Sequence, residues 1–109
     1  MSTQNLLIIG QGDIGLPVTN KLAQDGFNVT GLARRERHHY ALDANAKFLQ
    51  ADALTLSAEQ LQDFTAIAII VTPDDYSTSG YHDSYLAITQ HLATLADKLT
   101  NLTRVVFIS

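Results

Sequence analysis

Short apolar runs separated by longer amphipathic stretches extend along the whole chain. A continuous apolar run is typical of a strand buried on both faces of a sheet, and an alternating run indicates a strand with one buried face. These patterns predict five strands, at residues 5–9, 27–32, 46–50, 66–71 and 104–108. The chain therefore has the strand content of one small sheet.

Between these strands, apolar residues recur at helical spacing. The first helix is expected to end at Asp25–Gly26, a short one covers 37–42, and a long one covers 81–99. Ser57 and Gln60 have the spacing of a capping box, which predicts a brief helix after them. With right-handed crossovers, this alternation predicts a doubly wound α/β fold, Rossmann-like, with helices on both faces of a parallel five-stranded sheet of order 3-2-1-4-5.

The first strand leads directly into a Gly-x-Gly-x-x-Gly motif, which comprises Gly10, Gln11, Gly12, Asp13, Ile14 and Gly15. The first glycine permits a tight turn, the second lets a pyrophosphate approach the backbone, and the third lets the next helix pack closely on the strand. Unpaired N–H groups at the start of that helix favour an anion without any basic side chain. The motif predicts a dinucleotide site, and the alternative is a merely structural glycine turn.

The second strand is followed by Ala33, Arg34 and Arg35, where NAD-binding proteins commonly place an acidic residue. A carboxylate would repel the 2′-phosphate of NADP, whereas guanidinium groups bind it bidentately. We therefore expect NADP to be preferred, with NAD as the alternative. The competing interpretation is a solvated basic turn, in which Arg37 points to solvent or pairs with Glu36.

Ligands of doubly wound sheets bind at the carboxyl ends of the strands, near the point where the strand order reverses. Four loops of this chain are predicted to meet there. In chain order they would contact the pyrophosphate, the adenosine ribose phosphate, the adenine and the nicotinamide-side ribose. The loops are Gly10–Gly15, Ala33–Arg35, a third of Asp52, Ala53 and Leu54, and a fourth of Val71, Thr72 and Pro73.

Composition narrows the function further. The 109 residues make one domain, and a net charge of -4 with a pI near 5.3 argues against a nucleic-acid partner. No cysteine is present, and the amino terminus lacks the features of a signal peptide or membrane span, so a cytoplasmic protein is expected. His38 and His39 are not expected to share a helix face, and no third ligand is apparent, so no metal site is predicted.

The sequence resembles the extended short-chain dehydrogenases/reductases, also called the NAD-dependent epimerase/dehydratase family. The resemblance covers the whole chain and rests on Ile9–Gly15, Leu32–Arg35, Gln50–Leu54 and Arg104–Ser109. It implies that Asp52 and Ala53 lie against the adenine ring. For Asp52, a plain loop or helix-capping role stays open. The glycine pattern and the ending Val71-Thr72-Pro73 depart from those usual in the family.

The family's catalytic Ser or Thr and its Tyr-x-x-x-Lys are not found among these residues, so no catalytic residue is assigned. We expect residues 1–109 to be the amino-terminal NAD(P)-binding domain of a longer oxidoreductase, epimerase or dehydratase, inactive by itself. One alternative is a small regulatory nucleotide sensor that acts through a protein partner. Another is a ketoacid or hydroxyacid reductase with the same early motif.

The last predicted strand, 104–108, is apolar on both faces and would lie at a sheet edge. Bare apolar edges associate or aggregate. We therefore expect either a missing carboxyl-terminal portion or a second copy to cover it. Because members of the family often pair through the long helix, the resemblance favours 81–99 as the contact of a homodimer.

Overall fold

The computed structural model describes residues 4–70 and 78–108, and for 78–84 the backbone alone. The strands are β1 (Asn5–Ile9), β2 (Asn28–Ala33), β3 (Lys47–Gln50), β4 (Ala66–Ile69) and β5 (Arg104–Phe107). The α-helices are α1 (Gly15–Gln24), α2 (Ala58–Leu61) and α3 (Thr78–Leu95). Three short 3-10 helices complete the elements: η1 (Arg37–His39), η2 (Ala53–Thr55) and η3 (Ala96–Lys98).

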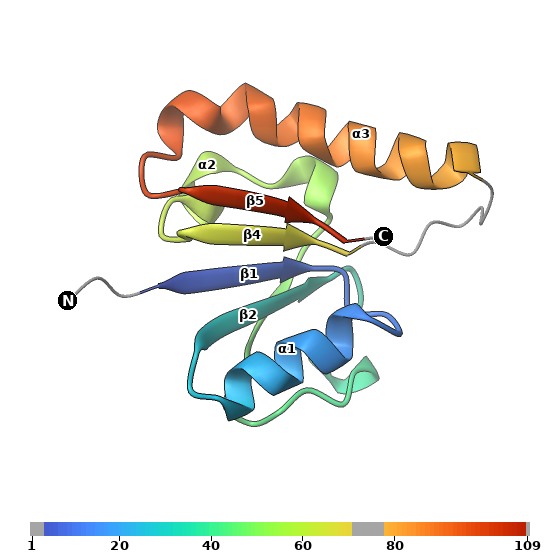
Figure 1. Cartoon of the computed structure of the whole chain (residues 1–109), viewed down its shortest axis with the longest axis vertical. Helices are drawn as coiled ribbons and strands as arrows, with labels where there is room; N and C mark the ends of the chain where they lie inside the picture. Colours follow the sequence, from blue (N-terminus) through green and yellow to red (C-terminus); the bar gives the residue numbers. More distant parts are fainter. Residues whose placement is uncertain (1–3, 71–77, 109) are drawn as a thin grey trace.

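The five strands form one parallel sheet in the order β3-β2-β1-β4-β5, as the sequence predicts (Figure 1). Consecutive strands pair from β1 to β3, and the chain then crosses to the other side of β1 to add β4 and β5. The order therefore reverses between β1 and β4. This is the position at which doubly wound folds bind their ligands, beyond the carboxyl ends of the strands.

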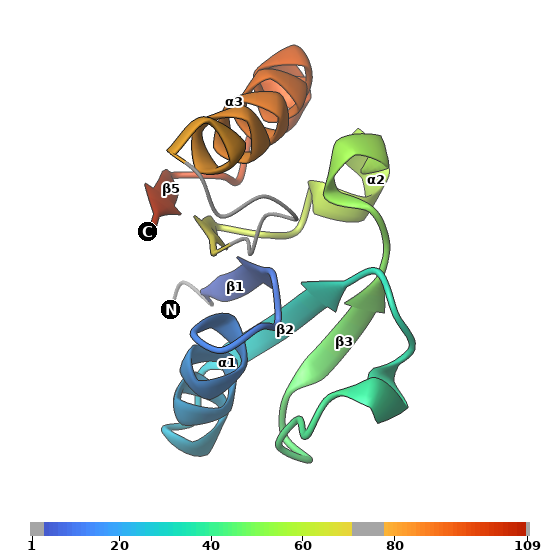
Figure 2. The same ribbon diagram turned by 90° about the vertical axis from the view of Figure 1, so that its right-hand side faces the viewer.

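Helices cover both faces of the sheet, with α1 on one face and α2 and α3 on the other (Figure 2). Each face has its own apolar core. The core under α2 and α3 contains Leu7, Ile9, Leu32, Ile67, Ile69, Ile88 and Leu92, and the core under α1 contains Ile8, Ala23, Val29, Ala46 and Ile70. Successive residues of β1 thus enter opposite cores, as the period of two in a strand requires. The two cores explain why β4, and β1 from Leu6 onward, are apolar.

The crossover from β2 to β3 differs from the sequence prediction, because the helix expected over 37–42 is only the three-residue η1. Side chains supply bonding partners to the backbone that follows. Asn20 of α1 donates to the Ala41 carbonyl oxygen and accepts from the Asp43 N–H, at 2.9 and 2.7 Å. Such partners satisfy the backbone without a helix, so the chain runs irregularly to β3.

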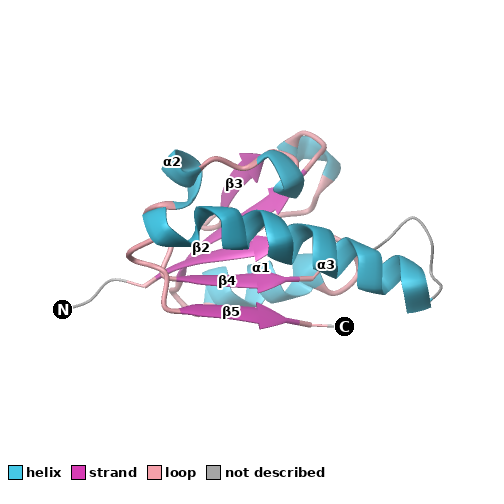
Figure 3. Ribbon diagram, turned by 90° about the horizontal axis from the view of Figure 1, so that it is seen from above, coloured by secondary structure: helices cyan, strands magenta, loops and turns pink. Residues whose placement is uncertain are grey.

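The remaining elements follow the predictions within a few residues. The capping box is confirmed, since Ser57 Oγ accepts from the Gln60 N–H and the Gln60 side chain accepts from the Ser57 N–H. The long helix α3 begins at Thr78 and its α-helical part ends at Leu95, where η3 continues it. Figure 3 shows that α3 extends along the length of the neighbouring strands. Among the described helices, none is both long enough and apolar enough to cross a bilayer.

Candidate functional site

The turn between β1 and α1 is built around close contact between its first and last glycines. Gly10 has a φ of 101°, a conformation that residues with a side chain rarely adopt. A Cβ placed on Gly15 would lie only 1.9 Å from the Gly10 carbonyl oxygen. The turn therefore requires a glycine at position 10 for its backbone conformation and a glycine at position 15 for lack of space.

The amino end of α1 is open. The first backbone hydrogen bond into the helix runs from the Leu16 N–H to the Gly12 carbonyl oxygen, at 3.1 Å. Within the described part of the chain, the N–H groups of 11–14 donate to no backbone or side-chain acceptor. The first turn also lacks an acidic residue and a side-chain cap. Free N–H groups at a helix start form a site for an anion.

Arg34 and Arg35 follow β2 at the same edge of the sheet, and both are exposed. Within the described residues, neither guanidinium group is paired with a carboxylate. The backbone of the loop is fixed from β3, because Gln50 Nε2 donates to the Arg34 carbonyl oxygen at 3.3 Å. This contribution of Gln50 was not predicted from the sequence. It leaves the two guanidinium groups available to a ligand.

Arg37 does not behave as predicted. Its Nη2 donates to the carbonyl oxygens of Asp43 and Ala46, at 3.2 and 2.9 Å, so it neither points freely to solvent nor pairs with Glu36. The Glu36 carboxylate lies 3.1 Å from His38 Nδ1 instead. Arg37 thus anchors the crossover. This structural role distinguishes it from Arg34 and Arg35.

The third predicted loop begins beside the second, since the Ala51 N–H donates to the Ala33 carbonyl oxygen at 3.0 Å. Asp52 Oδ1 accepts from the Leu54 N–H at 2.9 Å and caps η2, which is the capping role that the sequence left open. Ala53 is buried, and Leu54 is 48% exposed. The predicted contact of this loop with adenine stays a prediction.

The fourth predicted loop, Val71, Thr72 and Pro73, lies outside the described residues. The Ile70 N–H donates to the Ile9 carbonyl oxygen at 2.8 Å, which continues the β1–β4 ladder as far as Ile70. The structure therefore brings together three of the four predicted loops. They follow β1, β2 and β3, whose hydrogen-bonded ends lie side by side.

One further expectation about side chains is modified by the structure. The rings of His38 and His39 lie beside each other, with centroids 4.3 Å apart, although the sequence analysis placed them on different faces. In the part of the chain that the structure describes, no three His, Cys, Asp or Glu residues are grouped as a metal site would require.

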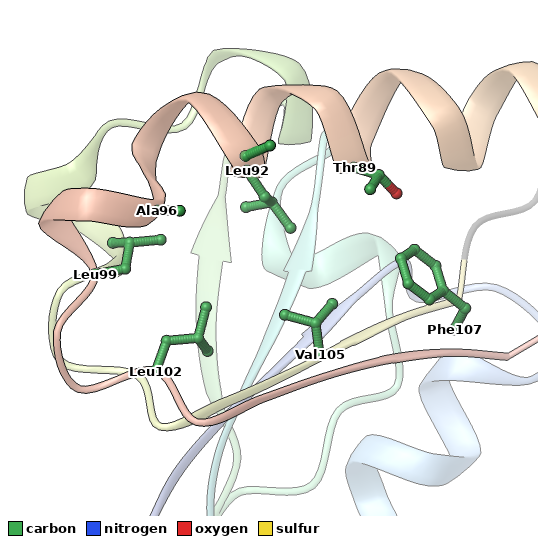
Figure 4. A pocket seen from close by; sticks show the side chains of 8 residues that line it. Thr89, Leu92, Ala96, Leu99, Leu102, Val105 and Phe107 are labelled. Atoms are coloured by element: carbon green, nitrogen blue, oxygen red, sulfur yellow. The ribbon is translucent and has the colours of Figure 1, made fainter.

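A hollow lies away from these loops, between α3 and β5 (Figure 4). We call it the β5 groove. Its volume is about 330 Å³, and it is lined by Thr89, Leu92, Ala93, Ala96, Leu99, Leu102, Val105 and Phe107. No lining residue is charged, and Thr89 Oγ1 already donates to the Tyr85 carbonyl oxygen at 2.7 Å. The β5 groove offers apolar contact and no group suited to holding a phosphate.

Comparison with known proteins matches the chain to solved structures only. No family model and no curated protein matches it, whereas 24 chains of solved structures do. An oxidoreductase from Lactococcus lactis has a TM-score of 0.75 at 20% identity, covering 97% of this chain and 48% of its own. An NAD-dependent NDP-hexosamine 5,6-dehydratase of tunicamycin biosynthesis has a TM-score of 0.73 at 24% identity, covering 96% of this chain and 36% of its own.

A third match is a short-chain dehydrogenase/reductase superfamily protein from Agrobacterium tumefaciens with bound NAD. Its TM-score is 0.67 at 16% identity, covering 95% of this chain and 32% of its own. This chain thus spans half or less of the length of the three proteins. Likeness at such low identity establishes the fold. The chain has the Rossmann-like α/β fold that it shares with these three proteins, as its sequence predicts.

Proposed function

We propose that this chain is a dinucleotide-binding domain that prefers NADP to NAD. The diphosphate would bind the open N–H groups at the start of α1, and the 2′-phosphate would bind Arg34 and Arg35. The matched proteins support a nicotinamide dinucleotide, since one is described as NAD-dependent and another as carrying NAD. The preference for NADP is our inference from this chain's own residues.

The observation that carries the proposal is the combination of charges at the carboxyl ends of β1 and β2. Two exposed guanidinium groups without a carboxylate partner, within the described residues, stand where an NAD site commonly has an acid. They adjoin a helix start that has neither a side-chain cap nor an acidic first turn. The guanidinium groups and the N–H groups at the helix start are all hydrogen-bond donors, and the phosphates of NADP offer acceptors to each.

Calorimetric titration with NADP and NAD tests the preference. We expect Arg34→Ala and Arg35→Ala to weaken NADP binding, by roughly 10- to 150-fold for a charge-assisted contact that is lost, and to leave NAD binding nearly unchanged. Arg104→Ala is the matched control. Arg104 is also exposed, but it begins β5 at the opposite end of the strands.

Equal affinity of the unaltered chain for NADP and NAD, unchanged by either substitution, would contradict the phosphate preference while leaving dinucleotide binding intact. Failure of both nucleotides to bind would contradict the whole proposal. An Arg104→Ala effect as large as that at Arg34 would indicate a general effect of surface charge instead of a local contact.

We further propose that the domain serves an oxidoreductase, epimerase or dehydratase of the extended short-chain type. The 109 residues contain no Tyr-x-x-x-Lys, so the reacting groups would have to come from other residues. The experiment is a steady-state assay of the 109-residue chain with NADPH and carbonyl substrates, beside a nucleotide-binding measurement. Binding without turnover is expected, and turnover by this chain would contradict the assignment of the chemistry to other residues.

A further inference from the structure

Gln11 stands out in the glycine loop because its polar side chain is buried. It is 6% exposed, whereas the three residues that follow it are all exposed. The sequence analysis placed Gln11 among the residues that contact the cofactor. The structure turns its side chain back against the sheet, where it contacts β2, and the predicted cofactor contact of Gln11 stays a prediction.

The amide of Gln11 bonds to the loop's own backbone. Its Nε2 donates to the Ile8 carbonyl oxygen at 3.2 Å and to the Gly10 carbonyl oxygen at 3.0 Å. Because both partners are acceptors, only the NH₂ end of the amide can face them. Oε1 is then buried without a hydrogen-bond partner among the described residues. A buried unpaired oxygen costs free energy, so the two bonds formed by Nε2 have to offset that cost.

Gly31 of β2 makes room for this amide. A Cβ on Gly31 would lie 2.8 to 2.9 Å from all three terminal atoms of the Gln11 side chain, closer than such contacts occur. Gly31 is not among the glycines with positive φ, so its backbone conformation does not require glycine. The Gln11 amide occupies the space into which a side chain at position 31 would project. This explains the glycine in the middle of β2.

The Gly10 carbonyl oxygen is enclosed from two directions. The Gln11 amide bonds to it, and Gly15 approaches it so closely that a Cβ there would lie 1.9 Å away. In a planar trans peptide, the carbonyl and the following N–H point in opposite directions. Holding the Gly10 carbonyl against the Gln11 amide and Gly15 therefore directs the Gln11 N–H to the opposite side, away from both.

We propose that Gln11 is a positioning residue, whose amide, seated against Gly31, holds the Gly10 carbonyl inward and keeps the loop N–H groups turned toward a bound diphosphate. The proposal rests on the proposed dinucleotide function for the identity of the ligand. The pairing of Gln11 with Gly31 rests on the geometry of the free protein alone.

A double-substitution cycle tests the pairing, with ADP as the diphosphate probe. Gln11→Ala and Gly31→Ala are each expected to weaken ADP binding roughly 10-fold, the first by removing the bonds and the second by displacing the amide. The double variant is expected to bind no worse than Gln11→Ala, because the methyl group added at position 31 then has no amide to displace. Gln24→Leu, at an exposed glutamine of α1, is the matched control.

Two readouts separate positioning from a general loss of structure. Affinity for 2′-AMP, which lacks the diphosphate and would engage the arginines and the predicted adenine loop, is expected to stay within about twofold in every variant. Hydrogen exchange of segment 10–15 without ligand is expected to accelerate in Gln11→Leu and Gly31→Ala. Gln11→Met replaces Gln11→Leu if the latter does not fold.

Losses of ADP affinity that multiply in the double variant would overturn the proposal, as would unchanged exchange and affinity in Gln11→Leu. An equal loss of ADP and 2′-AMP binding would also overturn it, in favour of a general structural role. If the unaltered chain binds neither NADP nor ADP, the proposed function fails. The exchange of segment 10–15 in Gln11→Leu and Gly31→Ala then still decides whether Gln11 and Gly31 hold the loop.

Discussion

The glycine loop and the β5 groove both lie beside strand ends or edges, but they differ in chemistry. The glycine loop presents N–H donors in a turn that needs Gly10 for its conformation and Gly15 for space. The β5 groove is a hollow of about 330 Å³ with an apolar lining, beside a strand whose four residues are all exposed. The contrast teaches that the amount of empty space does not identify a ligand site. The glycine loop has the N–H donors that an anion needs, whereas the β5 groove has an apolar lining.

The largest expected effect concerns Gly15 of the glycine loop. Gly15→Ala puts a Cβ 1.9 Å from the Gly10 carbonyl oxygen, so the turn must open. We expect NADP affinity to fall about 100-fold or more, and the free energy of unfolding to fall by about 1–3 kcal/mol. Calorimetry and thermal unfolding measure the two quantities.

Gly26→Ala is the control for this substitution. Gly26 has a φ of 91°, but nothing lies within 4 Å of an added Cβ. It should lower stability by about 1–2 kcal/mol through backbone strain and leave NADP affinity unchanged. A loss of affinity in Gly26→Ala similar to that in Gly15→Ala would show that stability, not loop geometry, governs binding.

The next effect concerns the exposed strand β5. Val105, Val106 and Phe107 are 37%, 40% and 49% exposed, and we expect the chain to self-associate through them. Val106→Lys should weaken that association roughly 10-fold, because a lysine on an open edge opposes pairing. Sedimentation over a range of concentrations measures it, with Phe27→Lys, at another exposed apolar residue, as control. An unaltered chain that stays monomeric at high concentration contradicts this expectation.

Filling the β5 groove should have a smaller effect, on stability alone. Ala93 lines the groove, and Ala93→Leu adds apolar contact in a helix. We expect about 1 kcal/mol of added stability and unchanged NADP affinity. Gln90→Leu, at an exposed residue of α3 outside the lining, should change stability by less than about 0.5 kcal/mol. If Ala93→Leu altered nucleotide affinity, the two regions would be coupled.

The smallest expected effect is that of salt. Arg34 and Arg35 are exposed, so their attraction to a 2′-phosphate is screened by ions. Raising the salt concentration from about 0.05 to about 0.5 M should weaken NADP binding a few-fold more than NAD binding. Equal salt dependence of the two affinities would argue against contact between the arginines and that phosphate.

The sheet order, the glycine turn and the capping box of α2 were all predictable from sequence. Each depends on residues close together in the chain, or on the alternation of strands with helices, and both are visible as local patterns. Strand and helix ends were predicted within a few residues, with the exception of 37–42. There Asn20 and Arg37 bond to backbone carbonyls at and beyond the end of the expected helix, and the chain between them runs irregularly.

Contacts between side chains and distant backbone were not predictable. Gln11 has a polar side chain in a ligand-type loop, which suggests exposure, and Gly31 resembles an ordinary interruption of a strand. Only the folded chain places the Gln11 amide over Gly31. The same holds for Gln50, whose partner is a backbone oxygen of the neighbouring loop. Such pairings leave no periodic signal, because the two partners are far apart in the sequence and meet only in the folded chain.

The hydrogen bond from Gln50 to the Arg34 backbone carbonyl has an evolutionary consequence. It does not involve the Arg34 side chain, so position 34 can change identity while its main chain remains tethered to β3. Descendants of this sequence would then be able to change the charge at position 34 with little disturbance of the scaffold around it.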